Sequence, residues 1–174
     1  NNLTQFGSKV FQETEVLLQK NELQKTQITI GIPKEIVFQE KRIALTPFSV
    51  ALLIASGCKV LIESGAGNAS NFLDHHYSEQ GALIVSDKNT VYQSDIIIKI
   101  ASPTMEEVLM MKHKQILFSS QQPSLMNFEV LKALSKKQIT ALSYEYLQDE
   151  GGHLSVMREM SEIVGTTSNL IAGE

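Results

Sequence analysis

Two cationic side chains, Arg42 and Lys99, follow apolar segments of the kind that form buried strands. Arg42 lies in the loop after residues 27–32, and Lys99 lies near the end of the isoleucine-rich segment 95–100. Ligands of open parallel sheets bind at the carboxyl ends of the strands, where a guanidinium can hold a carboxylate through two hydrogen bonds. The charged neighbours of Arg42 favour a solvated loop instead, while Lys99 either has a buried partner or reaches solvent at the strand end.

A glycine-rich segment, residues 63–70, offers a second kind of chemistry. Its sequence, Glu-Ser-Gly-Ala-Gly-Asn-Ala-Ser, follows an apolar segment and resembles the first half of a dinucleotide-binding loop. Ser70 stands where the third glycine would be, and the next helix signal comes only at Asp74. A dinucleotide loop leads directly into a helix whose N-terminus faces the pyrophosphate. We therefore interpret the segment as a turn.

The histidines and the single cysteine do not form a metal-binding pattern. His75 and His76 are adjacent, so on a helix their side chains diverge by about 100°. His113 and His153 fall in polar turns. Cys58 is the only cysteine, which excludes a disulfide within the chain and the common structural zinc sites. We expect surface histidines and no bound metal.

The apolar pattern alternates between short strand-like segments and longer helix-like segments. This alternation predicts an α/β fold, a doubly wound and mostly parallel sheet with helices on both faces. Helix starts are indicated by Thr46 before a proline and by Thr104 before two glutamates. We expect strands over 27–32, 58–63, 95–100, 115–118 and 139–144, and helices over 46–56, 74–81, 104–111, 126–136 and 159–172, the last opened near Ser155.

Length and composition indicate one globular domain with an added arm. The 174 residues are enough for a single core over residues 27–174, and residues 1–26 are expected to form an amphipathic helical arm. A net charge of −4 argues against nucleic-acid binding, and no apolar run is long enough to span a membrane. The single cysteine and the lack of a secretion-signal pattern lead us to expect a cytoplasmic protein.

A series of motifs occurs in a fixed order over residues 28–172. They are Gly31-Ile-Pro-Lys34-Glu35, Glu40-Lys41-Arg42-Ile-Ala-Leu-Thr-Pro47, Val60-Leu-Ile-Glu63-Ser-Gly-Ala-Gly67, the strand 95–99, Pro103 and Met160-Ser161-Glu162-Ile163-Val-Gly165. Together they resemble the N-terminal domain of alanine dehydrogenases and of the alpha subunits of proton-translocating NAD(P) transhydrogenases. The resemblance implies a flavodoxin-like doubly wound domain. In that family a Rossmann domain that binds NAD follows it, and this chain contains no such segment.

The resemblance also implies roles for individual residues. The arginine matching Arg42 binds the carboxylate of pyruvate or alanine, and the lysine matching Lys99 contacts that carboxylate and the reacting carbonyl oxygen, where it stabilises developing charge. A substrate-binding histidine of the dehydrogenases is replaced, and Gln122 falls closest to its place. Glutamine can hydrogen-bond a carbonyl oxygen but cannot exchange a proton at neutral pH. Lys34 and Glu35 are expected to hold the loop.

We therefore expect the substrate domain of an NAD-dependent alanine dehydrogenase, which converts L-alanine to pyruvate and ammonia. Its partner is the small-molecule substrate, its full-length form is expected to be a homo-oligomer, and this chain alone is expected to be inactive without the NAD-binding domain. The first alternative is the transhydrogenase alpha subunit, which also lacks the histidine. The second alternative is a stand-alone ligand-binding domain without enzyme activity.

Overall fold

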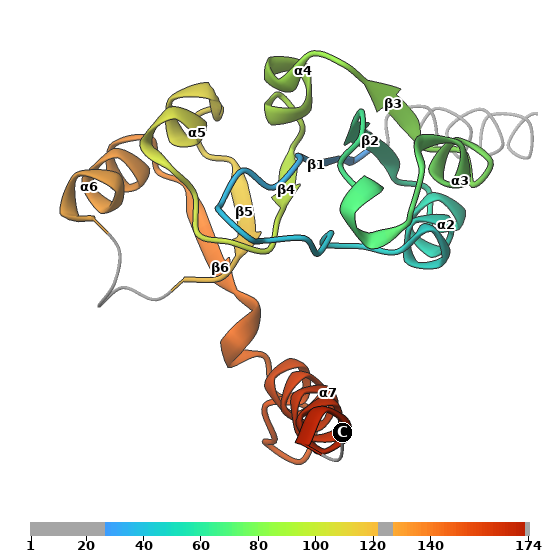
Figure 1. The fold of residues 1–174 in the computed structure, drawn as a ribbon. Helices are drawn as coiled ribbons and strands as arrows, with labels where there is room; N and C mark the ends of the chain where they lie inside the picture. Colours follow the sequence, from blue (N-terminus) through green and yellow to red (C-terminus); the bar gives the residue numbers. More distant parts are fainter. Residues whose placement is uncertain (1–26, 122–126, 173–174) are drawn as a thin grey trace, which may run out of the picture.

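A parallel sheet forms the centre of the computed structural model, which describes residues 27–121 and 127–172. Six strands lie parallel in the order β3-β2-β1-β4-β5-β6 (Figure 1). The α/β fold with a doubly wound sheet is thereby confirmed, while the helical arm expected over residues 1–26 lies outside the described residues. The strands are β1 (Thr29–Ile32), β2 (Lys59–Glu63), β3 (Leu83–Val85), β4 (Ile96–Ile98), β5 (Ile116–Ser119) and β6 (Thr140–Ser143).

The strand β3 and the α-helix α4 (Lys88–Tyr92) were not predicted from the sequence pattern. The five predicted strands lie in the flavodoxin-like order 2-1-3-4-5. With β3 added at the edge beside β2, the order becomes 3-2-1-4-5-6. The strand β3 has only three residues, too few for a clear sequence pattern. The helix α4 begins after Asp87, whose side chain accepts hydrogen bonds from the backbone N–H groups of Asn89 and Thr90.

Helices cover both faces of this sheet (Figure 1). On one face, Val50 and Tyr77 pack with the buried side chains of β1 and β2. On the other face, Tyr92, Val108 and Leu134 pack around the buried residues of β4 and β5. The sheet is therefore held between two hydrophobic layers. The first layer contains α2 (Pro47–Ala55) and α3 (Asp74–Ser78), and the second contains α4, α5 (Met105–Met110) and α6 (Phe128–Lys136).

Local signals set where α2 and α5 begin. Thr46 caps α2, because its Oγ1 accepts a hydrogen bond from the Ser49 N–H at 3.3 Å, and Pro47 is the first helical residue. Thr104 and Glu107 form a capping box at α5, with the Thr104 N–H donating to Glu107 Oε2 at 2.8 Å and the Glu107 N–H donating to Thr104 Oγ1 at 3.3 Å. Both predicted starts are confirmed to within one residue.

The glycine-rich segment after β2 is a turn, as predicted. Gly65 has a φ of 74°, which favours glycine, and a short 3₁₀ helix, η1 (Asn68–Ser70), follows. Asp74 accepts hydrogen bonds from the Gly65 N–H at 2.8 Å and from Ser64 Oγ at 2.7 Å. The Gly65 N–H, which a dinucleotide loop would turn toward a phosphate, is therefore bonded to a carboxylate of the chain itself.

Side-chain alternation along β4 decides what reaches each face of the sheet. Ile96 and Ile98 pack against the layer of α2 and α3, whereas Ile97 lies in the layer of α4 to α6. The strand is therefore covered on both faces, which is typical of a continuous apolar run in a parallel sheet. Lys99 follows in phase with Ile97, so its side chain points toward α5.

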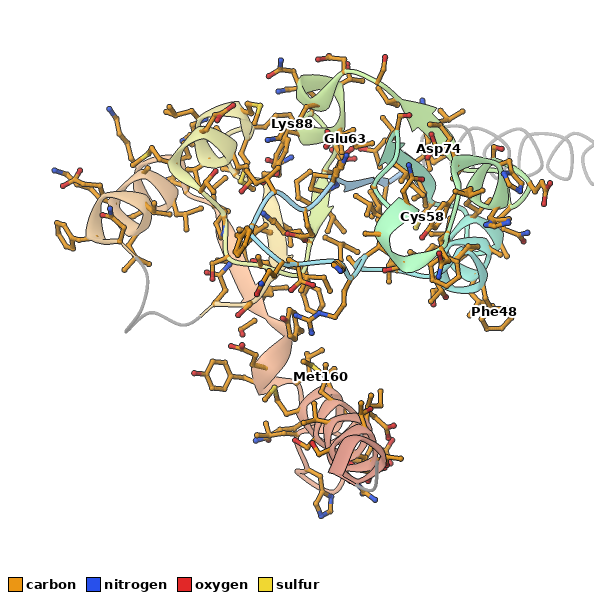
Figure 2. All side chains as sticks on the ribbon, viewed as in Figure 1. Phe48, Cys58, Glu63, Asp74, Lys88 and Met160 are labelled. Carbon is orange, nitrogen blue, oxygen red and sulfur yellow. The ribbon has the colours of Figure 1, made fainter. Side chains whose placement is uncertain are left out.

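The last helix, α7 (Ser155–Ala172), lies apart from the two helical layers (Figure 1). It contacts η2 (Tyr144–Tyr146), the 3₁₀ helix after β6. Its partly buried residues Val156, Met157 and Met160 share one helix face, and Figure 2 shows Met160 on the side turned toward the rest of the domain. Neither α7 nor any other helix in the described part of the chain is long and apolar enough to cross a membrane.

Candidate functional site

The strand order reverses between β1 and β4, the two central strands of the sheet. From β1 the chain continues outward through β2 and β3, and it then crosses back to β4 on the other side. Open α/β sheets bind ligands outside the carboxyl ends of the strands at such a switch point. The segments that follow β1, β4, β5 and β6 meet at this edge and line a common cavity.

Two cavities share walls at this edge. The larger, of about 650 Å³, mixes charged and polar side chains, including Glu40, Thr104, Ser120 and Glu145. The smaller, of about 230 Å³, is lined mainly by apolar residues. These are Ala44, Leu45, Ile98, Phe118 and Val156. Arg42, Ile100, Tyr144 and Met160 border both cavities, so the guanidinium-bearing residue stands where the polar and the apolar spaces meet.

Arg42 is held by a carboxylate of its own loop. Its Nε and Nη2 donate hydrogen bonds to Oε1 and Oε2 of Glu40 at 2.8 and 2.6 Å, and its backbone N–H donates to Oε1 at 3.0 Å. The Arg42 side chain is 54% exposed and that of Glu40 only 14%. The hydrogen bonds from Arg42 hold the pKa of Glu40 below its usual value, and Glu40 raises the pKa of the guanidinium. Both groups are therefore charged at neutral pH.

Lys99 is enclosed among buried partners on the α5 side of the sheet. Its Nζ donates to Oε1 and Oε2 of Glu107, both at 2.9 Å, and lies 3.7 Å from Oε2 of Glu35. The side chains of Lys99 and Glu107 are both fully buried. The hydroxyl of Tyr92 donates a further bond to Glu107 Oε1 at 2.8 Å. Lys99 therefore has the buried partner that its position at the end of a buried strand requires.

Burial raises the pKa of a carboxyl group, whereas the nearby ammonium of Lys99 lowers it, and both effects act on Glu107 and on Glu35. Burial alone would raise the pKa of Glu107, but Lys99 and the hydrogen bonds from Thr104 and Tyr92 hold this pKa below its usual value. Burial raises the pKa of Glu35, which lies farther from the ammonium. Burial also raises the pKa of Tyr92, so its hydroxyl keeps the proton that it donates to Glu107.

The loop that carries Arg42 is fastened to the end of β4. Glu35 accepts hydrogen bonds from the N–H groups of Ile100 at 2.5 Å and Ala101 at 3.5 Å. The Tyr144 hydroxyl, which follows β6, donates to the Ile100 carbonyl at 3.1 Å. Segments after three different strands are thus tied together at residue 100, which borders both cavities.

The structure brings the two predicted cations to the same edge of the sheet. Arg42 and Lys99 both line the smaller cavity, but their availability differs. Half of the Arg42 side chain is exposed, whereas the Lys99 side chain is fully buried and bonded to Glu107. The third predicted residue, Gln122, lies outside the described residues, so its place in the site stays a prediction from sequence.

Four further residues of the site were not singled out from the sequence. Tyr144 and Glu145 directly follow β6, so the rule that ligands bind at carboxyl ends of strands could have found them. In the sequence Glu107 is only a first-turn acid of a helix, and Glu40 only a charged neighbour of Arg42. No local pattern pairs either of them with its cation, because both pairings depend on folded contacts.

No metal centre is apparent in the part of the chain that the structure describes. Within residues 27–121 and 127–172, no three His, Cys, Asp or Glu side chains are grouped to hold a metal ion. The adjacent histidines of α3 have local contacts instead: the ring centroids of His75 and His76 lie 4.1 Å apart with the rings tilted by 55°, and His76 Nδ1 accepts a hydrogen bond from the Leu73 N–H.

Comparison with known proteins gives a consistent set of relatives. Residues 31–164 match the family model of the alanine dehydrogenase/PNT N-terminal domain. The chain is 36% identical over 149 residues to alanine dehydrogenase of Bacillus subtilis (strain 168), an alignment that covers 83% of this chain and 38% of that protein. It is 38% identical over 144 residues to alanine dehydrogenase of Methanococcus maripaludis, covering 80% of this chain and 37% of that protein. The chain therefore spans well under half the length of these relatives.

Two solved structures share the fold. An L-alanine dehydrogenase superposes with a TM-score of 0.69 and 31% identity, covering 73% of this chain and 35% of that one. A transhydrogenase from Sinorhizobium meliloti superposes with a TM-score of 0.62 and 27% identity, covering 68% of this chain and 35% of that one.

Proposed function

The chain belongs to the alanine dehydrogenase/PNT N-terminal domain family, and from this premise we propose that it is the substrate-binding domain of an NAD-dependent alanine dehydrogenase. The reaction is the reversible conversion of L-alanine to pyruvate and ammonia, with hydride transfer to NAD. In this proposal NAD is bound by a domain outside this chain and supplies the redox chemistry, while this domain binds and polarises the substrate.

The observation that carries the proposal is the position of Arg42. Arg42 borders both cavities at the switch point of the sheet, and its side chain remains half exposed after its bonds to Glu40. A guanidinium offers five N–H donors in a planar fork, and Glu40 accepts from only two of its nitrogens. Arg42 therefore has the charge, the exposure and the donors to bind a substrate carboxylate.

The smaller cavity supports a short aliphatic substrate. Its volume of about 230 Å³ lies below the range of roughly 300–1,000 Å³ that holds drug-sized ligands. Its apolar lining, with Leu45, Ile98 and Phe118 among it, suits a methyl group next to a carboxylate held by Arg42. A small 2-oxo acid or α-amino acid combines these two features in one molecule.

Lys99 and Gln122 complete the proposed site. Two of the three N–H donors of Lys99 are bonded to Glu107, so the third is the one left for a substrate oxygen, in competition with Glu35 at 3.7 Å. We assign the carbonyl oxygen of the substrate to this donor, which the fully buried side chain offers only once the cavity wall in front of it moves aside, and a second hydrogen bond to that oxygen to Gln122. The buried position of Lys99 places its charge behind the cavity, where low dielectric strengthens its effect on developing negative charge.

Pyruvate binding to the 174-residue chain tests the proposal without requiring NAD. Calorimetry or NMR titration of the wild type should show binding, and Arg42→Lys should weaken it by about 1.5–3 kcal/mol, because lysine keeps the charge but loses the planar fork. Arg158→Lys is the matched control, since Arg158 pairs on exposed α7 with Glu162, and it should bind pyruvate as the wild type does. Equal affinity in all three proteins would contradict the proposed site.

A transhydrogenase alpha-type subunit is the second candidate, and the superposition on the Sinorhizobium meliloti transhydrogenase favours it. The two functions separate in an assay of the full-length protein. Formation of NADH that depends on L-alanine supports the dehydrogenase. Hydride exchange between NADPH and NAD, with a membrane partner present and without alanine, supports the transhydrogenase.

A further inference from the structure

The bidentate contact between Glu40 and Arg42 is built by the loop itself. Gln39, directly before Glu40, has a φ of 65°, in the left-handed region that side chains other than glycine adopt infrequently. The Glu40 N–H donates to the Val37 carbonyl at 3.0 Å and closes a turn. The turn brings the Glu40 carboxylate back onto both the backbone and the guanidinium of Arg42.

The donors of Arg42 are divided between two directions. Glu40 accepts from Nε and Nη2, which form one edge of the guanidinium. Within residues 27–121 and 127–172, no acceptor is bonded to Nη1, so the edge formed by Nη1 and the second N–H of Nη2 is left for a ligand. Glu40 lines the larger cavity but not the smaller, whereas Arg42 lines both.

We propose that Glu40 is a positioning residue, which holds one edge of the Arg42 guanidinium so that the adjacent edge, formed by Nη1 and Nη2, meets the ligand carboxylate beside the smaller cavity. This inference rests on the proposed function and adds to it a residue that binds through Arg42 rather than to the ligand. Glu40 is the fixed member of the pair, because its side chain is only 14% exposed and also accepts from the Arg42 backbone. Without Glu40, the four side-chain torsions of Arg42 would become ordered only when the ligand binds, which costs conformational entropy. Glu40 already orders this side chain in the free protein and so lowers the entropy cost of binding.

The charge of Glu40 has a second effect on anion binding, opposite to that of positioning Arg42. A carboxylate beside Arg42 lowers the positive potential that an anion meets, and it occupies donors that the anion could use. If Glu40 acts only as a charge or as a competitor, its neutralisation tightens anion binding. If Glu40 positions Arg42, its neutralisation weakens binding despite the more positive potential.

The test measures pyruvate affinity and the Arg42 Nε–H signal in the same ¹⁵N-labelled samples. Glu40→Gln should weaken pyruvate binding about tenfold, the equivalent of one hydrogen bond, and should speed solvent exchange of the Arg42 Nε–H. Glu40→Asp keeps the charge but shortens the side chain, so it should also weaken binding. Glu106→Gln, the same change at an exposed position of α5, should match the wild type in both readouts.

Each outcome bears on a different claim. Equal or tighter pyruvate binding by folded Glu40→Gln, with the wild type binding normally, overturns the positioning role and leaves the proposed function intact. Wild-type affinity in Glu40→Asp overturns it as well, because charge alone would then suffice. A wild type that does not bind pyruvate overturns the proposed function together with this inference.

Discussion

At the scale of single residues, Lys99 and Glu107 form the most buried ion pair in the described part of the chain. Breaking a buried pair by removing one partner leaves the other charge without compensation and typically destabilises a protein by about 3–5 kcal/mol. Lys99→Met should therefore lower the free energy of unfolding by that order, measured by urea denaturation. Lys112→Met is the matched control: its pair with Asp95 is exposed, so it should change stability by about 1 kcal/mol or less.

A double variant separates charge balance from chemistry at the same position. Lys99→Met combined with Glu107→Leu removes both charges, and buried pairs replaced by apolar residues often leave stability unchanged. The double variant should recover most of the stability lost in Lys99→Met. If it folds but fails to bind pyruvate, Lys99 also contacts the ligand. If it binds pyruvate as the wild type does, the proposed substrate contact of Lys99 is wrong and the residue serves only the fold.

The two carboxylates around Lys99 should give stability profiles of opposite slope. The pKa of Glu107 is lowered from 4.5 in the folded protein. Its contribution to stability is therefore fully present above pH 4.5 and is lost as the pH falls through the lower folded pKa. The pKa of Glu35 is raised, so its contribution is present at low pH and is lost as pH rises through the folded pKa. On acidification, the free energy of unfolding of the wild type should fall relative to that of Glu107→Gln. Relative to that of Glu35→Gln, it should rise. Parallel profiles would contradict these shifts.

Individual residues also show which parts of the site can be predicted from the sequence. The positions of Arg42 and Lys99 followed from one rule, that ligands gather at the carboxyl ends of parallel strands. What Lys99 bonds to did not follow, because Glu107 reaches it only after β4 and α5 pack together. The family motif assigns both cations to the substrate, but only the folded structure shows that one of them is exposed by half and the other is fully buried.

At the scale of elements, the close packing of α4 on β1 depends on Gly31. A Cβ at Gly31 would collide with the Val91 carbonyl oxygen and lie 2.8 Å from Ser94 Oγ. Gly31→Ala should therefore destabilise the fold by about 1–3 kcal/mol through overpacking. Gly165→Ala is the control, since nothing lies within 4 Å of its added Cβ on exposed α7. It should stabilise the helix by up to about 1 kcal/mol. Thermal unfolding of both variants checks the prediction, and equal melting temperatures would contradict it.

The elements that sequence predicts well are those with their own start signals. The Thr46 cap before Pro47, and the capping box of Thr104 and Glu107, mark the starts of α2 and α5 through residues close together in the sequence. The strand β3 has only three residues and lies at the sheet edge. Too few residues carry its periodicity for a pattern to emerge, and its pairing with β2 exists only in the folded sheet. Because β3 lies at the edge beside β2, the switch point between β1 and β4 is the same with or without it.

At the scale of the whole molecule, stability should be uneven between the sheet and α7. β1 and β4 are central strands whose residues Ile32 and Ile97 are fully buried, so their amides should exchange with solvent only on global unfolding. The helix α7 lies apart from both hydrophobic layers and packs on η2, and it should open locally and exchange faster. Hydrogen exchange measured by mass spectrometry on dilute protein distinguishes the two tiers.

Met160 connects these two parts, because it borders both cavities from the side of α7 that faces the domain (Figure 2). Met160→Ala removes apolar contact at that seam, so it should speed exchange throughout α7 and leave β1 and β4 unchanged. Ile163→Ala is the matched control on the same helix, since Ile163 is 66% exposed, and it should leave exchange in α7 as in the wild type. If α7 instead exchanges as slowly as β4, and Ile163→Ala speeds it, the exposed face of α7 is covered in solution. A second copy of the chain would be that cover if exchange in α7 becomes faster on further dilution.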